Sequence, residues 1–214
     1  MHDNLHDYRK NYEKGALTKD AVDANPMQQF QTWFYEVKDI GGVDEVNAMT
    51  LTTLGQDGFP KGRVVLLKKY DAYGFYFYTN YSSDKGRAIA NYNQVSLSFF
   101  WPNMERQILI KGMAEKTSET DSQNYFASRP KGSQLGAMVS DQSSVVPNRQ
   151  VLEDELKDLE AQFEDKEVPK PSNWGGFVVK PVEFEFWQGR PNRLHDRIRY
   201  RLDGLDWTIE RLAP

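Results

Sequence analysis

The chain has 214 residues, of which 39% are hydrophobic and 27% are charged, as is typical of a globular protein with a buried core. Its formal net charge of −4 argues against general binding to nucleic acid or to an anionic membrane surface. The absence of cysteine excludes disulfides, thiolate nucleophiles, iron–sulfur clusters and thiolate zinc sites, and no apolar run approaches the ~18 residues of a membrane-spanning helix.

The N-terminal 25 residues are polar and charged, with few apolar side chains. This composition predicts a mobile arm over residues 1–25. The segment MHDNLHDYRK lacks the apolar core of a signal peptide, so we expect a cytoplasmic protein. Residues 26–214 are expected to form a single domain, because their number suits one core and no internal repeat or low-complexity tract appears.

An amphipathic helix is predicted over residues 27–37 (MQQFQTWFYEV), where large apolar side chains recur at helical spacing. Asn25 is a candidate N-cap for this helix, and Pro26 would occupy its first position. The alternating pattern of residues 47–54 predicts a strand. The turn GQDG then leads into the next strand.

The following segment, residues 61–91, combines a hairpin with the start of a helix. The aliphatic run 64–67, the turn YDAYG and the aromatic residues 75–79 predict two antiparallel strands. Polar residues that favour an N-cap follow directly, and the candidates are Asn80, Ser82 and Ser83. A strand that runs into a capped helix is a candidate anion site, because free N–H groups and the helix dipole both favour a phosphate there.

Four cations accompany this segment. Lys85 and Arg87 lie in the first turns of the predicted helix, and Arg63 and Lys68 flank the aliphatic strand. An offset of five residues places Arg63 and Lys68 on opposite faces of a regular strand, so they would serve two different anions unless the strand carries a bulge. From these residues alone, the favoured interpretation is solvated cations beside a core hairpin.

The remaining elements are, in chain order, two strands, three helices and three further strands. Strands are predicted over 94–101, 106–113, 176–186, 198–202 and 207–212, and helices over 118–128, over 133–139 and from Pro147 through Phe163. Short turns between many strands predict a mainly β fold, an antiparallel barrel with peripheral helices, in place of βαβ units. The chain also lacks the G-x-G-x-x-G and Walker patterns of nucleotide-binding folds.

An aromatic strand next to cationic residues is a further candidate site. Phe184, Phe186 and Trp187 precede Arg193 and His195, and the stretch Trp187-Gln188-Gly189 is interpreted as a turn out of the strand. Aromatic faces beside Arg and His suit a planar anionic ring. The alternative interpretation is an exposed strand of alternating cations.

Several phosphate-binding patterns therefore recur without any metal ligands or thiols. Tyr125, Arg129, Lys131 and Ser133 form another such set around a helix end. We find neither a Ser-His-Asp order nor a close carboxylate pair for hydrolysis. No metal site is expected, and a phosphorylated organic cofactor that carries the chemistry is favoured.

Nine segments also occur in the order and spacing of a known family. They are RVVLLK (63–68), YTN (78–80), ERQILIKG (105–112), YFASRPKGSQLGA (125–137), SDQSS (140–144), SNWGGF (172–177), FWQG (186–189), RLHDR (193–197) and WTIERLAP (207–214). On these segments the chain, from about Tyr8 to the carboxyl terminus, resembles the pyridoxamine 5′-phosphate oxidase family. The resemblance implies an FMN-binding split β-barrel and a homodimer with FMN at its interface.

The resemblance also implies the activity. It is the oxidation of pyridoxamine 5′-phosphate and pyridoxine 5′-phosphate to pyridoxal 5′-phosphate, with O2 as acceptor giving H2O2 and with ammonia released from the amine. The expected partners are these small molecules and a second copy of the chain, with neither nucleic acid nor membrane.

Matching positions give the implied site residues. Cofactor binding is implied for Arg63, Val64, Val65, Leu66, Leu67, Lys68, Tyr78, Thr79, Lys85, Gln107, Gln142, Ser143, Trp187 and Arg197. Substrate binding is implied for Arg9, Tyr12, Lys68, Tyr125, Arg129, Ser133, Arg193, Leu194 and His195. Arg193, His195 and Arg197 are the implied catalytic residues, and the arm would close over the substrate.

One position departs from the family pattern, because Asp84 stands where a basic residue is usual. Its charge favours the helix start but repels a phosphate, and our hypothesis is that Arg87 compensates. Two alternative functions remain open from the residues. One is a non-catalytic flavin or pyridoxal-phosphate binding protein on the same barrel, and the other is a barrel that stacks single-stranded nucleic acid on its aromatic strands.

Overall fold

The computed structural model describes residues 4–214, so the first three residues of the predicted arm lie outside it. The chain divides into two compact units. The terminal unit comprises the residues up to Thr50, Ser96–Lys111 and Pro181–Pro214, and the pocket unit comprises Leu51–Val95 and Gly112–Lys180. None of the helices in the described part of the chain combines the length and the apolar character needed to cross a bilayer.

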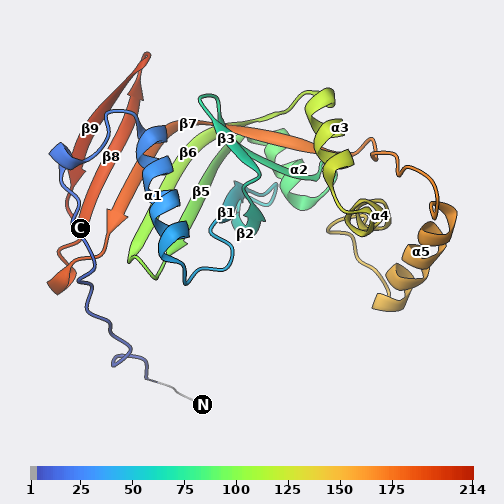
Figure 1. Ribbon diagram of the computed structural model, residues 1–214, viewed down its shortest axis with the longest axis horizontal. Helices are drawn as coiled ribbons and strands as arrows, with labels where there is room; N and C mark the ends of the chain where they lie inside the picture. The colour runs from blue at the N-terminus through green and yellow to red at the C-terminus, as the bar shows by residue number, and fades with distance from the viewer. Residues whose placement is uncertain (1–3) are drawn as a thin grey trace. The chain divides into compact units, whose positions relative to one another are not determined.

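Nine strands form a single sheet (Figure 1). Their bounds are β1 (Ala48–Leu54), β2 (Pro60–Leu66), β3 (Lys69–Asp71), β4 (Gly74–Asn80), β5 (Gln94–Trp101), β6 (Arg106–Lys116), β7 (Trp174–Gln188), β8 (Asp196–Asp203) and β9 (Asp206–Leu212). The strand order is β2-β1-β5-β6-β7-β4-β3, and β8 pairs with both β7 and β9. The pairings of β3 with β4, β4 with β7, β7 with β8 and β8 with β9 are antiparallel.

The bounds of β7 correct one interpretation. Trp187 and Gln188 belong to the strand and do not form a turn, because they pair with Arg197 and Asp196 of β8. The longest predicted helix also begins later than expected. Asn148 caps α5 (Arg149–Gln162) by accepting the N–H of Val151 at 3.2 Å, so Pro147 lies outside the helix.

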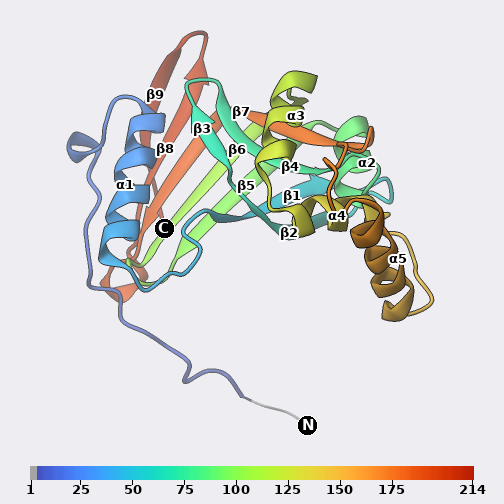
Figure 2. The same cartoon turned by 45° about the vertical axis from the view of Figure 1, so that its right-hand side comes forward.

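In the terminal unit, helix α1 (Pro26–Ile40) covers part of the sheet (Figure 2). Its N-terminus confirms the prediction, since the side chain of Asn25 accepts the N–H of Met27 at 2.9 Å and Pro26 is the first helical residue. Its apolar face is buried against the strands. The ring of Phe30 lies 5.2 Å from that of Phe99, and the ring of Trp33 lies 5.2 Å from that of Phe186. The periodicity therefore identified the buried face.

The pocket unit carries four helices. They are α2 (Asp84–Asn91), α3 (Glu119–Ser128), α4 (Lys131–Val139) and α5. Ser83 caps α2 by accepting the N–H of Gly86 at 3.3 Å, which confirms one of the three candidate caps, and Ser118 caps α3. Short 3-10 helices, η1 (Lys19–Ala21) and η2 (Pro191–Arg193), lie in the terminal unit.

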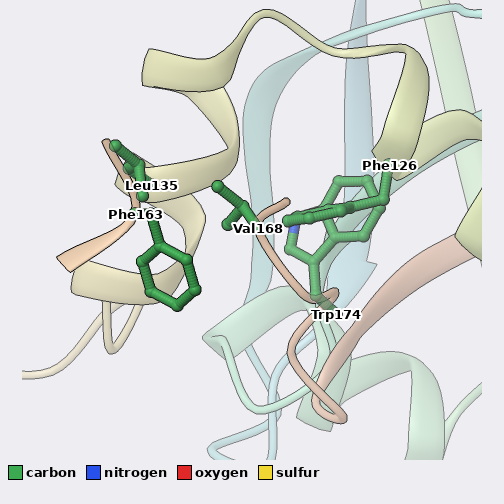
Figure 3. Packing of buried hydrophobic residues seen from close by; sticks show 5 residues of the cluster. All are labelled: Phe126, Leu135, Phe163, Val168 and Trp174. Carbon is green, nitrogen blue, oxygen red and sulfur yellow. The ribbon is translucent and has the colours of Figure 1, made fainter. Parts of the chain in front are cut away.

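A satellite hydrophobic cluster joins α3, α4, the end of α5 and the start of β7 (Figure 3). Phe126 of α3, Leu135 of α4, Phe163, Val168 and Trp174 are all buried in it. Figure 3 shows the side chains of Phe126 and Trp174 in contact, and their ring centroids are 5.1 Å apart. The cluster fixes the helix ends that carry Arg129 and Ser133.

Candidate active site

A cavity of about 670 Å³ lies in the pocket unit. It is lined by the side of β2 and the residues after it, by β4, by the start of α2, by the α3–α4 corner and by the loop after α4. The predicted site residues among its lining are Val64, Val65, Leu66, Lys68, Tyr78, Thr79, Lys85, Tyr125, Arg129, Ser133 and Gln142. Residues that lie far apart in sequence are thus collected around a single space.

One part of the cavity wall is a polar group centred on Lys85. The ammonium donates to Gln142 Oε1 at 2.9 Å and to Thr79 Oγ1 at 3.3 Å, and Thr79 Oγ1 donates to Gln142 Oε1 at 2.9 Å. Burial, followed by repulsion from Arg63, lowers the pKa of Lys85. Within residues 4–214 this ammonium forms no ion pair with a carboxylate, so an anion in the cavity would meet a partly desolvated cation.

Arg63 does not line this cavity. Its guanidinium donates to Leu51 O at 3.0 Å and to Thr53 Oγ1 at 2.8 Å. It lines a neighbouring cavity of about 400 Å³, together with Lys61 and Arg87. Arg63 lies within β2 and Lys68 lies two residues beyond its end, and the two cations line different cavities. This separation agrees with the opposite strand faces expected from their spacing.

Asp84 is held by two cations. Lys61 Nζ lies 2.7 Å from Asp84 Oδ2, and Arg87 Nη2 lies 2.7 Å from Asp84 Oδ1. The hydrogen bond and charge of Lys61, with Arg87, lower the pKa of the Asp84 carboxyl. The backbone N–H of Asp84 donates to Ser143 Oγ at 3.2 Å. The negative charge at the start of α2 is therefore offset locally by Lys61 and Arg87.

Another part of the cavity wall is aromatic. Tyr78 and Tyr125 stack with ring centroids 3.8 Å apart, and Trp174 stacks against both at 5.7 Å and 6.2 Å. Flat aromatic walls of this kind suit the ring of an organic ligand, since stacking adds to the free energy of apolar burial. Trp174 was not among the predicted site residues, although it lies in the quoted segment SNWGGF.

Arg129 shows that the cavity suits an anion. Its guanidinium carbon lies 4.8 Å above the ring of Trp174, and its Nη1 atom is buried without a hydrogen-bond partner in the described chain. Burial lowers the pKa of Arg129. A buried donor of a charged group without an acceptor is unfavourable, so this guanidinium is suited to a ligand oxygen. The exposed side chains of Lys68 and Ser133 line the same cavity.

A second group of predicted residues gathers in the terminal unit, around Trp187 and His195. Their ring centroids are 4.7 Å apart, and the ring of Tyr12 stands edge-on to them at 5.6 Å and 5.7 Å. His195 Nδ1 accepts the N–H of Arg190 at 3.1 Å. Burial, then repulsion from Arg193, lowers the pKa of His195, so at neutral pH the ring is uncharged and carries its proton on Nε2.

Arg197 is fixed by a carboxylate that sequence reasoning missed. Its Nε and Nη2 atoms donate to the two oxygens of Glu185 at 2.7 Å and 3.0 Å, and its Nη1 atom donates to Ala213 O at 2.8 Å. Such a two-point ion pair sets the plane of the guanidinium. Arg193 follows Asn192, and both have positive φ angles of 62° and 57°. Two successive residues of the turn between β7 and β8 therefore adopt the left-handed backbone conformation.

Other predicted residues are not gathered in either group. Leu67 is buried, and Leu194 is exposed. Gln107 lies in β6, and the Nε atom of Arg9 donates to His6 O at 2.9 Å. Conversely, the cavity lining includes residues that sequence reasoning missed, namely Asn80, Pro130, Gly136, Ala137, Ser140 and Trp174. All six lie inside the quoted segments, which was the only signal available for them.

Comparison with known families and proteins gives consistent matches. The profile described as pyridoxamine 5′-phosphate oxidase matches residues 36–163, and that described as the pyridoxine 5′-phosphate oxidase C-terminal dimerisation region matches residues 174–214. A pyridoxine/pyridoxamine 5′-phosphate oxidase of Flavobacterium johnsoniae is 60% identical over 210 residues, which is 98% of each chain.

Two solved structures share the fold. The crystal structure of PhzG from Burkholderia lata, in complex with tetrahydrophenazine-1-carboxylic acid, has a TM-score of 0.86 and 29% identity, and covers 93% of this chain and 98% of its own. A pyridoxamine 5′-phosphate oxidase-related, FMN-binding protein from Nostoc punctiforme has a TM-score of 0.70 and 13% identity, and covers 90% of this chain and 100% of its own. These likenesses confirm the predicted antiparallel split β-barrel with peripheral helices.

Proposed function

The chain belongs to the pyridoxamine 5′-phosphate oxidase family, an oxidoreductase family whose cofactor is FMN, and from this premise we propose its reaction. The enzyme oxidises pyridoxamine 5′-phosphate and pyridoxine 5′-phosphate to pyridoxal 5′-phosphate in the salvage of vitamin B6. O2 is reduced to H2O2, and the amine substrate takes up water and releases ammonia. The observation that carries this proposal is the Nη1 atom of Arg129, which is buried without a hydrogen-bond partner in the described chain and lies in a cavity walled by stacked aromatic rings.

The chain supplies binding and orientation, and its sequence contains no cysteine that could act as a redox group. When bound, FMN supplies the two-electron acceptor that takes a hydride from the C4′ carbon of the substrate and returns the electrons to O2. Lys85, Arg63 and Ser143 would hold the cofactor phosphate, with Tyr78, Thr79 and Gln142 beside it. The other residues expected to contact FMN are Val64, Val65, Leu66, Leu67, Lys68, Gln107, Trp187 and Arg197.

The substrate phosphate is assigned to Lys68, Tyr125, Arg129 and Ser133. Arg129 provides the buried donor, and Lys68 is a cation lining the same cavity. Two charged anchors fix both the position and the orientation of a phosphate ester. Fixing the reacting carbon in this way lowers the entropic part of the barrier, an effect worth ~7–11 kcal/mol in favourable cases.

Arg193, His195 and Arg197 are assigned to the substrate ring and its reacting carbon, with Leu194 beside them. The uncharged His195 can accept a proton only at a nitrogen that does not already carry one, and Nδ1 is engaged by Arg190. We therefore assign His195 Nε2–H as a hydrogen-bond donor to the substrate. Arg9 and Tyr12 of the arm would close over it.

The match of residues 174–214 to a dimerisation region supports a homodimer. This region contains Trp187, Arg193, His195 and Arg197. We propose that FMN binds at the interface between two copies of the chain, and that residues 26–214 act as one FMN-binding domain behind an arm of residues 1–25.

The absorption spectrum of the FMN-loaded protein tests the proposal. Anaerobic addition of pyridoxine 5′-phosphate should bleach the blue-light band of the flavin, and admission of air should restore it with formation of pyridoxal 5′-phosphate and H2O2. A band that stays unchanged in the presence of saturating ester would overturn the oxidase assignment. It would favour the alternative of a non-catalytic flavin or pyridoxal-phosphate binding protein.

A further inference from the structure

Glu105 is a buried charged residue that the proposed function does not use. It precedes β6, and only 2% of its surface is exposed. Its backbone φ angle is 55°, in the left-handed region that residues other than glycine seldom adopt. A buried carboxylate in an unfavourable backbone conformation persists only where the surrounding contacts compensate for both costs.

The hydrogen-bond and ion-pair partners of its carboxylate lie in the N-terminal arm. Glu105 Oε2 accepts the backbone N–H groups of Glu13 at 2.8 Å and of Lys14 at 3.0 Å, and Oε1 lies 3.3 Å from Lys10 Nζ. Burial by itself would raise the pKa of Glu105, but the two N–H groups and Lys10 outweigh it and hold the pKa below its ordinary value. The carboxylate is therefore charged at neutral pH and binds three successive parts of the arm.

The main chain of Glu105 binds the strand end that carries Trp187. Glu105 O accepts the N–H of Gly189 at 2.8 Å and Nε2 of Gln188 at 3.3 Å. The same residue thus joins the arm, through its side chain, to the end of β7, through its backbone.

Tyr12 lies in the arm between Lys10 and Glu13, two of the residues that the Glu105 carboxylate contacts. It directly precedes Glu13, and its ring is edge-on to Trp187 and His195. A Cβ atom on Gly189 would lie only 2.7 Å from Tyr12 Cγ, so the ring packs directly against the backbone of the strand end. Further along the arm, the Leu17 N–H donates to Asp196 Oδ2 at 3.0 Å. The arm is thus attached to the rest of the terminal unit on both sides of Gly15.

We propose that Glu105 is a positioning residue for substrate binding. Its carboxylate holds residues 10–14 in place, so that the Tyr12 ring stays packed edge-on against Trp187 and His195 and restricts the escape of the substrate. This inference rests on the proposed function for its effect on catalysis. The attachment itself is independent of that function.

The Glu105→Gln variant tests the proposal in the full-length, FMN-loaded protein. Gln keeps the side-chain size but removes the charge that the two N–H groups and Lys10 share. We expect trypsin cleavage after Arg9 and Lys14 to become about tenfold faster, and KM for pyridoxine 5′-phosphate to rise about tenfold, which is the ratio given by the loss of one charge-assisted hydrogen bond. The dissociation constant of FMN should not change.

Glu115→Gln is the matched control, because Glu115 lies on β6, the strand that follows Glu105, in an exposed ion pair with Lys180. It should leave both the cleavage rate and KM unchanged. Glu105→Gln should also have no further effect on KM in a Tyr12→Ala background, since the carboxylate acts through Tyr12. Additive effects of the two substitutions, or an unchanged cleavage rate in Glu105→Gln, would overturn the proposal.

If Glu105→Gln does not fold, Lys10→Met tests the same attachment. The Lys10 side chain is 58% exposed, so its replacement should not disturb folding. Faster cleavage after Lys14 together with a smaller rise in KM supports the proposal, and an unchanged protein overturns it. If the unmodified protein shows no oxidase activity, the proposed function fails. The cleavage rates alone then support or overturn the attachment by Glu105.

Discussion

The cations of the cavity in the pocket unit differ from the arginines of β8 and β9 in the terminal unit. Lys85 and Arg129 contact neutral groups and aromatic rings, and Arg129 keeps a buried donor unpartnered in the described chain. Arg197, Arg199 and Arg211 are each paired with a carboxylate, at 2.7, 2.6 and 2.7 Å. The first kind of cation is available to an anionic ligand, whereas the second is fixed in orientation by the protein.

The difference indicates that the pocket unit contributes affinity for an anion and that the terminal unit contributes side chains of fixed orientation. A cation without a carboxylate can offer its full charge to a phosphate, because binding does not first require an ion pair to be broken. A guanidinium that donates two hydrogen bonds to a carboxylate has a fixed orientation, but much of its charge is already neutralised and it adds less to the affinity for an anion. We therefore expect substitutions of the cavity cations in the pocket unit to change binding, and substitution of the carboxylate that pairs with Arg197 in the terminal unit to change turnover.

The largest expected effect follows from Arg129. Replacing it with Met keeps much of the apolar contact with Trp174 but removes the buried donor. KM for pyridoxine 5′-phosphate should rise about 100-fold, near the upper end of the range for loss of a charge-assisted hydrogen bond, because the donor is buried and both partners are charged. Steady-state kinetics under air measure this. Arg149→Met, which removes an exposed arginine paired with Glu153, is the control, and an equal rise in that variant would contradict the assignment.

Glu185→Gln tests the role assigned to the paired arginines of the terminal unit. The amide cannot accept both donors of Arg197, so the guanidinium loses its fixed plane. We expect kcat to fall about tenfold, the size of one charge-assisted hydrogen bond, while KM and FMN content change little. Single-turnover reduction of the flavin measures this. A large loss of bound FMN with unchanged reduction by the remaining holoenzyme would show that Glu185 acts on cofactor binding instead.

Arg87→Ala should have a smaller effect, on cofactor affinity. It removes one of the two cations that offset Asp84, so the start of α2 becomes more negative and repels a phosphate. Because the pair is exposed, we expect the dissociation constant of FMN to rise only about two- to fivefold. Fluorescence titration of the apoprotein measures it. An unchanged constant would remove the hypothesis that Arg87 compensates for Asp84.

The smallest expected effect is on the titration of His195. Its pKa lies below the ordinary value of 6.5 because of burial and the charge of Arg193. Unfolded His195 takes up a proton at a higher pH than folded His195 does, so this residue costs stability as pH falls through 6.5 toward its folded pKa, and costs none above that window. In Arg193→Met the NMR titration of His195 should move upward. A downward shift would contradict the assigned repulsion.

Much of the fold follows from short stretches of sequence. The prediction for β5 has the same bounds as the observed strand, Gln94–Trp101, because its alternation is complete within eight residues. The start of α1 was also predictable, since Asn25 and Pro26 act on the N–H groups of their immediate neighbours. The end of β7 was not, because Trp187 and Gln188 are in a strand through their pairing with β8 and not through their own pattern.

In the candidate site, too, some features follow from the sequence and others from the tertiary structure. The sequence by itself determined the residue types, namely cations, serines and aromatic rings without thiols, and the motifs that indicated the family. Only the tertiary structure decided that Arg63 and Lys68 line different cavities, that Glu185 fixes Arg197, and that Glu105 holds the arm. The physical reason is distance along the chain. Caps and strand alternation depend on neighbours a few residues apart, whereas Glu105 and Glu13 are separated by 92 residues and meet only after folding.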